Sequence, residues 1–98
     1  MLKFKVVPVK PLDNGLVCQN LKRIRQHLEL SQLDMHKYAG VSEGAQHQYE
    51  QGRSKNIFLD TVYKSLWLFN QLVREGCEIT IEDLCGEINV NKIRKRSI

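Results

Sequence analysis

Ser31, Gly40, Ser42 and Gly52 divide residues 31–52 into two short segments. Ser31 and Ser42 can each cap a helix N-terminus, because a serine hydroxyl accepts hydrogen bonds from the free backbone N–H groups of the following turn. Gly40 and Gly52 are suited to ending a helix, since glycine adopts the left-handed backbone conformation at least cost. The spacing predicts two short helices joined by a tight turn, with the second helix crossing the first steeply and projecting from the surface.

Apolar side chains recur at helical spacing on both sides of this unit. One face before it holds Val17, Leu21, Ile24 and Leu28, and one face after it holds Val62, Leu66, Phe69 and Val73. We expect Asn56 or Asp60 to begin the later helix and Gly76 to end it. Thr80 and Asp83 have the spacing of a capping box for one more short helix. The middle of the chain is therefore predicted to be helical.

The two ends of the chain have a different pattern. Leu2–Val7 alternates apolar and basic residues before two prolines, which indicates an extended arm or edge strand over residues 1–15. Residues 87–93 alternate again, so a second strand is expected in the basic C-terminal segment, 87–98, after a helical domain over 16–86. Because a lone strand leaves backbone groups unpaired, we hypothesise that the two end strands pair, within one chain or across a dimer. The alternative is that both ends are loose.

The net charge of +4 comes from the C-terminus. Residues 1–91 hold 11 basic and 11 acidic side chains, so the surplus is due to Lys92, Arg94, Lys95 and Arg96. These residues are predicted to form either a solvated tail or an arm that contacts phosphates and adds salt-sensitive affinity.

Composition and spacing exclude several classes of protein. No apolar run approaches the roughly 18 residues that span a bilayer, and the opening residues lack the apolar stretch of a signal peptide. The odd number of cysteines, Cys18, Cys77 and Cys85, argues against a secreted disulfide framework. We therefore expect a cytoplasmic protein without a membrane contact.

Catalytic chemistry is not indicated either. The histidines His27, His36 and His47 have no partners at the spacing of a zinc site. The chain also lacks a phosphate-cradling glycine loop and a metal-binding cluster of carboxylates. We expect no enzymatic activity, no cofactor and no metal.

Four segments of the middle region carry a family resemblance. They are Leu21-Lys22-Arg23-Ile24-Arg25, Leu30-Ser31-Gln32, Ala39-Gly40-Val41-Ser42 and Tyr49-Glu50-Gln51-Gly52-Arg53. In that order and spacing they resemble the lambda-repressor-like (Cro/repressor, XRE-type) helix-turn-helix family, over about Leu21 to Leu84. The resemblance implies an all-α, five-helix DNA-binding domain, to which short terminal β-strands can be added.

The resemblance also implies a function. It predicts a sequence-specific transcriptional regulator, and more narrowly a repressor of phage or bacterial type, that binds double-stranded DNA through residues 42–51. One such helix contacts few base pairs, so the expected form is a homodimer on a palindromic operator, with half-sites about 34 Å apart. The implied base-reading residues are Ser42, Glu43, Gly44, Ala45, His47 and Gln48, and the implied phosphate-binding residues are Gln32, Arg53 and Lys55. The alternative for each is an ordinary exposed polar residue.

Four residues depart from the family pattern. Glu43 brings a negative charge to the DNA-facing surface, and Gly44 weakens a helix by about 0.5 to 1 kcal/mol relative to Ala. His36 and Gln46 stand at inner positions where the family has small and branched apolar residues. We hypothesise that the His36 ring and the Gln46 amide hydrogen-bond to each other, the alternative being that both turn outward to water. These departures favour a second possible function, a protein-binding module such as an antitoxin or adaptor, in which a regulatory protein is the partner.

Overall fold

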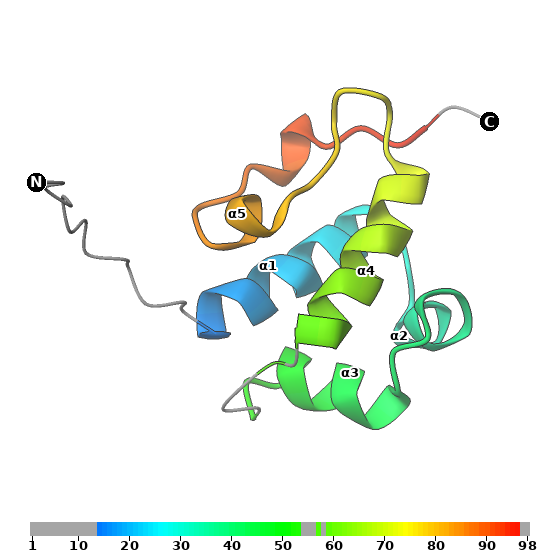
Figure 1. The fold of residues 1–98 in the computed structure, drawn as a ribbon, viewed down its shortest axis with the longest axis vertical. Coiled ribbons are helices and arrows are strands. Elements are labelled where there is room, and N and C mark those ends of the chain that lie inside the picture. Colours follow the sequence, from blue (N-terminus) through cyan, green and yellow to red (C-terminus); the bar gives the residue numbers. More distant parts are fainter. Residues whose placement is uncertain (1–13, 54–56, 58, 97–98) are drawn as a thin grey trace, which may run out of the picture.

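The computed structural model describes residues 14–53, 57 and 59–96, so the predicted N-terminal arm or strand lies outside the described residues. The elements along the chain are α1 (Asn14–His27), α2 (Gln32–Asp34), η1 (Met35–Ala39), α3 (Glu43–Glu50), α4 (Leu59–Leu72), α5 (Ile81–Leu84) and η2 (Val90–Lys92). Of these, η1 is one π-helical turn and η2 is one 3₁₀ turn. The prediction of an all-α domain with five α-helices is confirmed (Figure 1).

The two long helices, α1 and α4, carry the apolar faces expected from the sequence. All eight predicted residues are buried: Val17, Leu21, Ile24, Leu28, Val62, Leu66, Phe69 and Val73. In Figure 1 α4 crosses in front of α1, and α1 also contacts α3, α5 and η2. The core therefore lies between α1 and α4 and is closed by the shorter elements around them.

Local capping explains where the two short central helices begin. The Ser31 hydroxyl accepts from the Asp34 N–H at 3.0 Å, and the Asp34 carboxylate accepts from the Ser31 N–H at 2.8 Å. The Ser42 hydroxyl accepts from the Ala45 N–H at 3.2 Å and so begins α3. Between them Gly40 ends η1 with a φ of 73°, a left-handed conformation that favours glycine. The predicted pair of helices joined by a tight turn is present, with the first helix divided into α2 and η1.

A second capping box places α5 against α1. The Thr80 hydroxyl accepts from the Asp83 N–H at 3.2 Å, and the Asp83 carboxylate accepts from the Thr80 N–H at 2.8 Å, as the sequence predicts. The buried Asn20 amide of α1 donates to the carbonyls of Leu84 and Gly86, each at 2.8 Å. This side chain ties the end of α5 to the middle of α1.

The prediction of a strand over residues 87–93 is wrong. The Asn89 side chain accepts from the Asn91 N–H at 3.1 Å and starts the 3₁₀ turn of η2. Alternating apolar residues usually indicate a strand, but here Ile88 and Val90 pack against the helical core around a turn. Ile93 follows them into the core and is only 7% exposed. The hypothetical pairing with Leu2–Val7 lies outside the described residues.

The C-terminal segment continues along the end of α4. The Arg74 N–H donates to the Arg94 carbonyl at 2.8 Å, and the Arg96 N–H donates to the Leu72 carbonyl at 2.7 Å. Within the described residues this antiparallel contact forms one isolated bridge and no strand. The contact lies where α4 ends, at Leu72. The helix thus ends four residues before the predicted end at Gly76. Up to residue 96 the segment is therefore attached to the domain, and the prediction of a solvated tail does not fit it.

This attachment is testable by removing the Ile93 side chain from the core. We expect Ile93→Ala to lower the free energy of unfolding by about 2 to 5 kcal/mol, as truncation of a buried aliphatic side chain does, measured by urea denaturation. Lys92→Ala, an exposed neighbour, serves as the control and should change it by less than about 0.5 kcal/mol. An equally small effect of Ile93→Ala would show that the segment is not part of the core.

Candidate nucleic-acid interface

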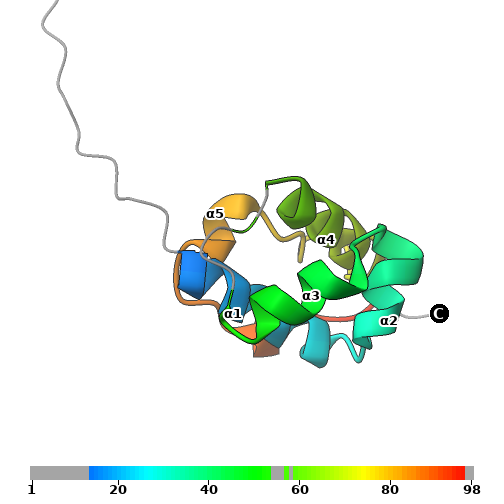
Figure 2. The same cartoon turned by 90° about the horizontal axis from the view of Figure 1, so that it is seen from below.

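Helix α3 lies on the surface with its outer side uncovered by any other described element. Viewed from below, it is the element nearest the reader, with α1 and α2 on either side (Figure 2). Its inner side contacts α1, α2 and η1. The buried residues of α3 are Gln46, Tyr49 and Glu50. The predicted projecting helix is thus present and open to a partner.

The implied base-reading residues lie together on this outer side. Ser42, Glu43, Gly44, His47 and Gln48 are exposed, and Ala45 is half-buried. A side chain at Gly44 would meet no atom within 4 Å, so packing does not require glycine there. Among these side chains Glu43 is the only carboxylate, and none of them is lysine or arginine. The outer side of α3 is therefore polar but not basic.

The implied phosphate-binding residues are distributed around the same helix. Gln32 is the first residue of α2 and is half-buried, whereas Arg53 is exposed after Gly52, whose φ is 70°. Lys55 lies outside the described residues. The first two could support a polyanion bound along α3, since backbone contacts of this kind position a duplex without reading it.

Two lysines that the sequence analysis did not single out lie close to α3. Lys64 of α4 lines a hollow of about 440 Å³ together with Ser42 of the turn and Ala45 of α3. Its ammonium group also pairs with the Asp60 carboxylate at 2.9 Å. Lys22 of α1 lines another hollow, beside Glu50 at the other end of α3. No local sequence signal could have indicated either residue, because both reach α3 through packing between distant segments.

A buried ion pair joins α3 to α1. The Arg25 Nε and Nη2 atoms donate to the two carboxylate oxygens of Glu50 at 2.8 and 2.7 Å, and Nη1 donates to the Leu30 carbonyl at 2.6 Å. The side chains are only 11% and 1% exposed. Two parallel N–H···O bonds fix both the separation and the relative orientation of the two groups. The angle of α3 therefore depends on this pair.

The buried amide of Gln46 extends the pair into a network. Its nitrogen donates to the Tyr49 hydroxyl and to the carboxylate of Glu50, the last two residues of α3. Burial opposes ionisation of Glu50, but the hydrogen bonds from Arg25 and Gln46 and the Arg25 charge outweigh it, so its pKa lies below the ordinary value. Burial raises the pKa of Tyr49, and the neighbouring carboxylate raises it further. The phenol thus stays neutral while the carboxylate stays charged.

The hypothesis of a His36–Gln46 hydrogen bond is wrong. His36 is exposed, and its Nδ1 atom lies 3.1 Å from the Val41 carbonyl across the turn. Gln46 is fully buried, and its amide nitrogen is engaged by acceptors on its own helix. The Gln46 Oε1 atom has no hydrogen-bond partner among the described residues. The alternative, in which both side chains turn outward, therefore holds for His36 but not for Gln46.

The basic C-terminal residues lie far from α3. Figure 1 places the segment that contains them at the top of the domain, beside the end of α4, and α3 at the bottom. Lys92, Arg94, Lys95 and Arg96 are exposed there, and Lys95 pairs with Glu29 at 2.8 Å. Within one molecule these side chains and α3 face opposite ends, so they would not contact the same stretch of a short duplex.

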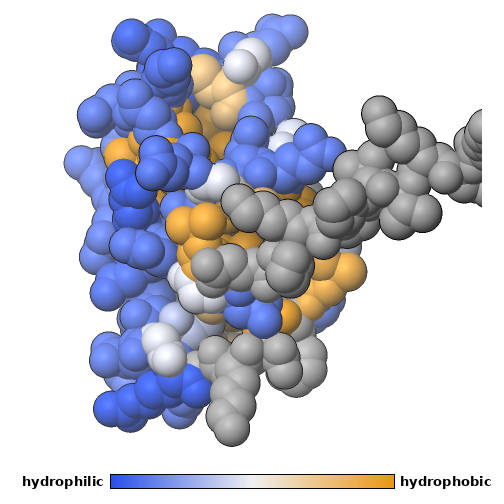
Figure 3. All heavy atoms as spheres, turned by 90° about the vertical axis from the view of Figure 1, so that its left-hand side faces the viewer, coloured by the Kyte–Doolittle hydropathy of each residue, from blue (hydrophilic) through white to orange (hydrophobic). Residues whose placement is uncertain are grey.

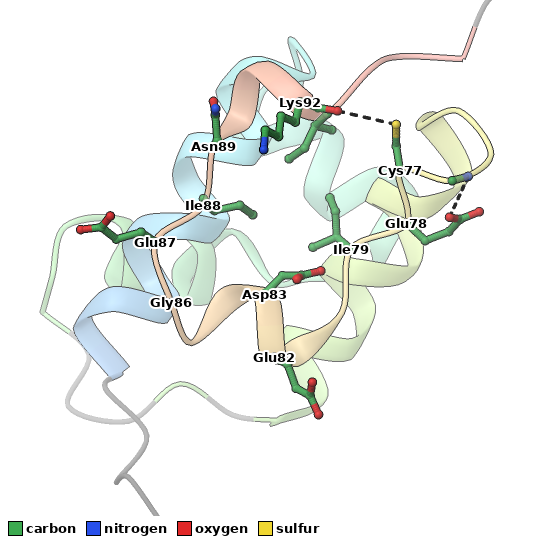
Figure 4. Close-up of a pocket in the computed structure, with 12 residues that line it drawn as sticks. Cys77, Glu78, Ile79, Glu82, Asp83, Gly86, Glu87, Ile88, Asn89 and Lys92 are labelled. Carbon is green, nitrogen blue, oxygen red and sulfur yellow. Dashed lines mark hydrogen bonds between the residues drawn. The ribbon is translucent and has the colours of Figure 1, made fainter.

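A further hollow of about 480 Å³ lies between α5 and the C-terminal segment (Figure 4). Four of the residues that line it are acidic: Glu78, Glu82, Asp83 and Glu87. Glu78 and Asp83 already accept backbone hydrogen bonds, and Glu82 and Glu87 point away from the hollow. The molecular face around α5 is largely hydrophilic, with hydrophobic side chains reaching the surface in its middle (Figure 3). The hollow has no converging pair of groups that could perform acid–base chemistry.

Comparison with known proteins adds no assignment, because no family model, curated protein or solved structure matches this chain. Among the described residues no helix is long and apolar enough to cross a membrane. The same residues contain no group of three or more side chains placed to hold a metal ion. The three cysteines are unpaired; Cys18 is buried, Cys77 half-buried and Cys85 exposed.

The Arg25–Glu50 pair should be the most sensitive polar contact of the domain. Arg25→Ala leaves the Glu50 charge buried without its partner, so we expect a loss of about 3 to 5 kcal/mol in the free energy of unfolding, measured by urea denaturation. Lys64→Ala breaks the exposed pair with Asp60 and should cost about 1 kcal/mol or less. Equal effects of the two variants would contradict the structural role of Arg25.

The same pair predicts a pH dependence. Because the pKa of Glu50 is lowered by folding, its contribution to stability is present above the unfolded value of about 4.3 and is lost as the pH falls through the folded value. Denaturation midpoints measured from pH 7 to pH 3 should fall below about pH 4.3. Glu50→Gln removes this titration, so its midpoint should fall less steeply, and an unchanged slope would contradict the assignment.

Proposed function

We propose that this protein binds double-stranded DNA through α3 and regulates transcription, with repression as the simplest outcome of occupying a site. The observation that carries the proposal is the two-sided character of α3. Its inner side is held by a buried ion pair and amide network, whereas its outer side presents only polar groups and backbone to solvent. A rigidly held helix with a free polar face is suited to the major groove.

The exposed groups divide into base-reading and positioning roles. The Gln48 amide can make two hydrogen bonds with adenine N6 and N7, and the Glu43 carboxylate can accept from cytosine N4. Gly44 allows the backbone to approach the duplex closely, since it carries no side chain. Arg53, and Lys64 if it leaves Asp60, would contact phosphates and set the register of α3.

Specific recognition by this helix needs more than one copy. α3 has eight residues and can contact only a few base pairs. We therefore propose that two copies occupy a palindromic operator, with half-sites about 34 Å apart or a multiple of that distance. A cytoplasmic location and the lack of enzymatic activity remain predictions from the sequence.

A second candidate function is favoured by the charges around α3. The six implied base-reading residues include the acidic Glu43 and no lysine or arginine, and the exposed basic residues of the C-terminal segment lie at the other end of the domain. A protein partner tolerates such a surface better than a polyanion does. In that case α3 would bind another protein, as an antitoxin or an adaptor does.

The two candidates differ in their DNA titrations. Selection from a random duplex pool should yield a palindromic consensus, and binding to it should exceed binding to random duplex by about a thousandfold or more at physiological salt. Gln48→Ala should relax the preference at one base pair at a loss of about 1 to 3 kcal/mol. Arg53→Ala should weaken all duplexes alike and reduce the salt slope by about 1.

Gln71 is an exposed amide on α4, so Gln71→Ala is the matched control. It should change neither the base preference nor the salt dependence of binding. Weak binding of every duplex alike would contradict the proposal of a sequence-specific regulator. It would favour the protein-binding function instead.

A further inference from the structure

One side of α4 exposes large apolar side chains at regular spacing. Leu59, Tyr63 and Trp67 are 58%, 56% and 58% exposed and follow one another at intervals of four residues. They form one row along the helix, which we call the α4 row. Figure 1 shows α4 in front of α1, and Figure 2 shows it at one edge of the domain, so part of its surface is not covered by another described helix.

The fold itself does not account for this exposure. The opposite side of α4 already supplies the core through Val62, Leu66 and Phe69. Large apolar and aromatic side chains exposed to this extent leave roughly 100 Å² each in water, or about 300 Å² for the row. The largest apolar patch of a typical monomer has about this size, and such a patch often has a function.

We propose that the α4 row binds the α4 row of a second copy of this chain, with the two helices antiparallel. A two-fold axis at Tyr63 places this ring against its own counterpart. Leu59 then lies against the partner's Trp67, and Trp67 lies against the partner's Leu59. An aliphatic residue at one end of the row thus meets an indole at the other, as a self-complementary interface requires.

The charges beside the row argue for this occupant and this orientation. Asp60 and Lys64 lie next to each other on the same flank, where they form an exposed ion pair at 2.9 Å. In the antiparallel arrangement Asp60 of each copy comes near Lys64 of the other. Two contacts between unlike charges then form beside the paired rows, one on each side of the two-fold axis. The macrodipoles of two antiparallel helices also attract each other. A parallel arrangement would not oppose these two charges.

The size of the row limits the strength of the contact. A stable interface buries about 800 Å² from each partner, and the row supplies less than half of that. The association is therefore weak in dilute solution and becomes populated where copies are concentrated.

The consequence for function rests on the proposed DNA binding. α3 lies at the N-terminal end of α4 (Figure 1), so an antiparallel pair carries its two α3 helices at opposite ends. Such a pair cannot place both helices on one face of a short operator. The pair instead joins two separate duplex segments. The α4 contact is therefore different from the contact that would hold two copies on a palindrome.

The chain contains its own probe for this contact, because Trp67 is its only tryptophan. With rising protein concentration and no DNA present, the Trp67 emission should shift to shorter wavelength as the indole leaves water. The average mass in analytical ultracentrifugation should rise over the same range. Tyr63→Glu should weaken both changes about tenfold or more in dissociation constant.

Leu33→Ser removes an exposed apolar residue from α2 and serves as the matched control. This variant should keep both the Trp67 emission shift and the increase in average mass. Circular dichroism of each variant verifies that the domain is folded. A mass that stays monomeric at the highest soluble concentration would overturn the proposal. So would association during which Trp67 emission does not shift, because another surface would then be responsible.

A charge exchange tests the orientation. Asp60→Lys places only positive charge on the flank, and Lys64→Glu places only negative charge there, so each variant alone should associate more weakly than the parent chain. An equimolar mixture should associate more strongly than either variant alone, since unlike flanks then meet across the two-fold axis. A mixture no better than its components would overturn the antiparallel pairing.

Bridging is tested separately with two different duplexes, one immobilised and one labelled. Capture of the labelled duplex should require protein and should be lost in Tyr63→Glu while binding to a single duplex is kept. If no duplex binds but the Trp67 shift is present, the proposed function fails and the α4 contact stands. If duplex binds without that shift, the α4 contact fails alone.

Discussion

The ion pair between Arg25 and Glu50 is the interaction on which the rest of the structure depends. It joins α1 to the last turn of α3 through two nearly parallel hydrogen bonds between almost fully buried groups. The same guanidinium binds the Leu30 carbonyl, so it also holds the loop that leads into α2. Because a buried charge is costly without its partner, any other orientation of α3 would leave either group unsatisfied. One side chain thus positions both short central helices, α2 and α3.

This anchoring of the inner side explains what the outer side of α3 can do. Gln46 completes the network from within α3. Among the described residues, the side chains of its solvent-facing neighbours make no hydrogen bonds except the Ser42 cap. The exposed groups are then free for a partner. Their lack of positive charge, however, means that shape and base-edge hydrogen bonds would have to supply most of the specificity in a DNA complex, since phosphates would be held mainly by residues outside α3 such as Arg53.

Local signals in the sequence predicted those parts of the fold that depend on few neighbours. The caps at Ser31, Ser42 and Thr80 each act within one helical turn, so they are visible in the order of residues alone. The buried faces of α1 and α4 follow from a period of 3.6 residues in the same way. The exposure of α3 followed from the short turn after Gly40. Its function and the family resemblance remain predictions.

Contacts between residues far apart in the chain decided the remaining features of the fold. Residues 87–93 alternate as a strand does, but the core formed by α1 and α4 accommodates Ile93 after a 3₁₀ turn. His36 faces solvent because the π-helical turn and the Val41 carbonyl set its direction, while Gln46 finds acceptors within α3. The positions of Lys64 beside α3 and of the basic C-terminal residues away from it exist only after packing. The sequence by itself thus determined where α2, α3 and α5 begin and which faces α1 and α4 bury, since capping and periodicity are local. Only the tertiary structure decided which polar groups meet, because that depends on residues far apart in the chain.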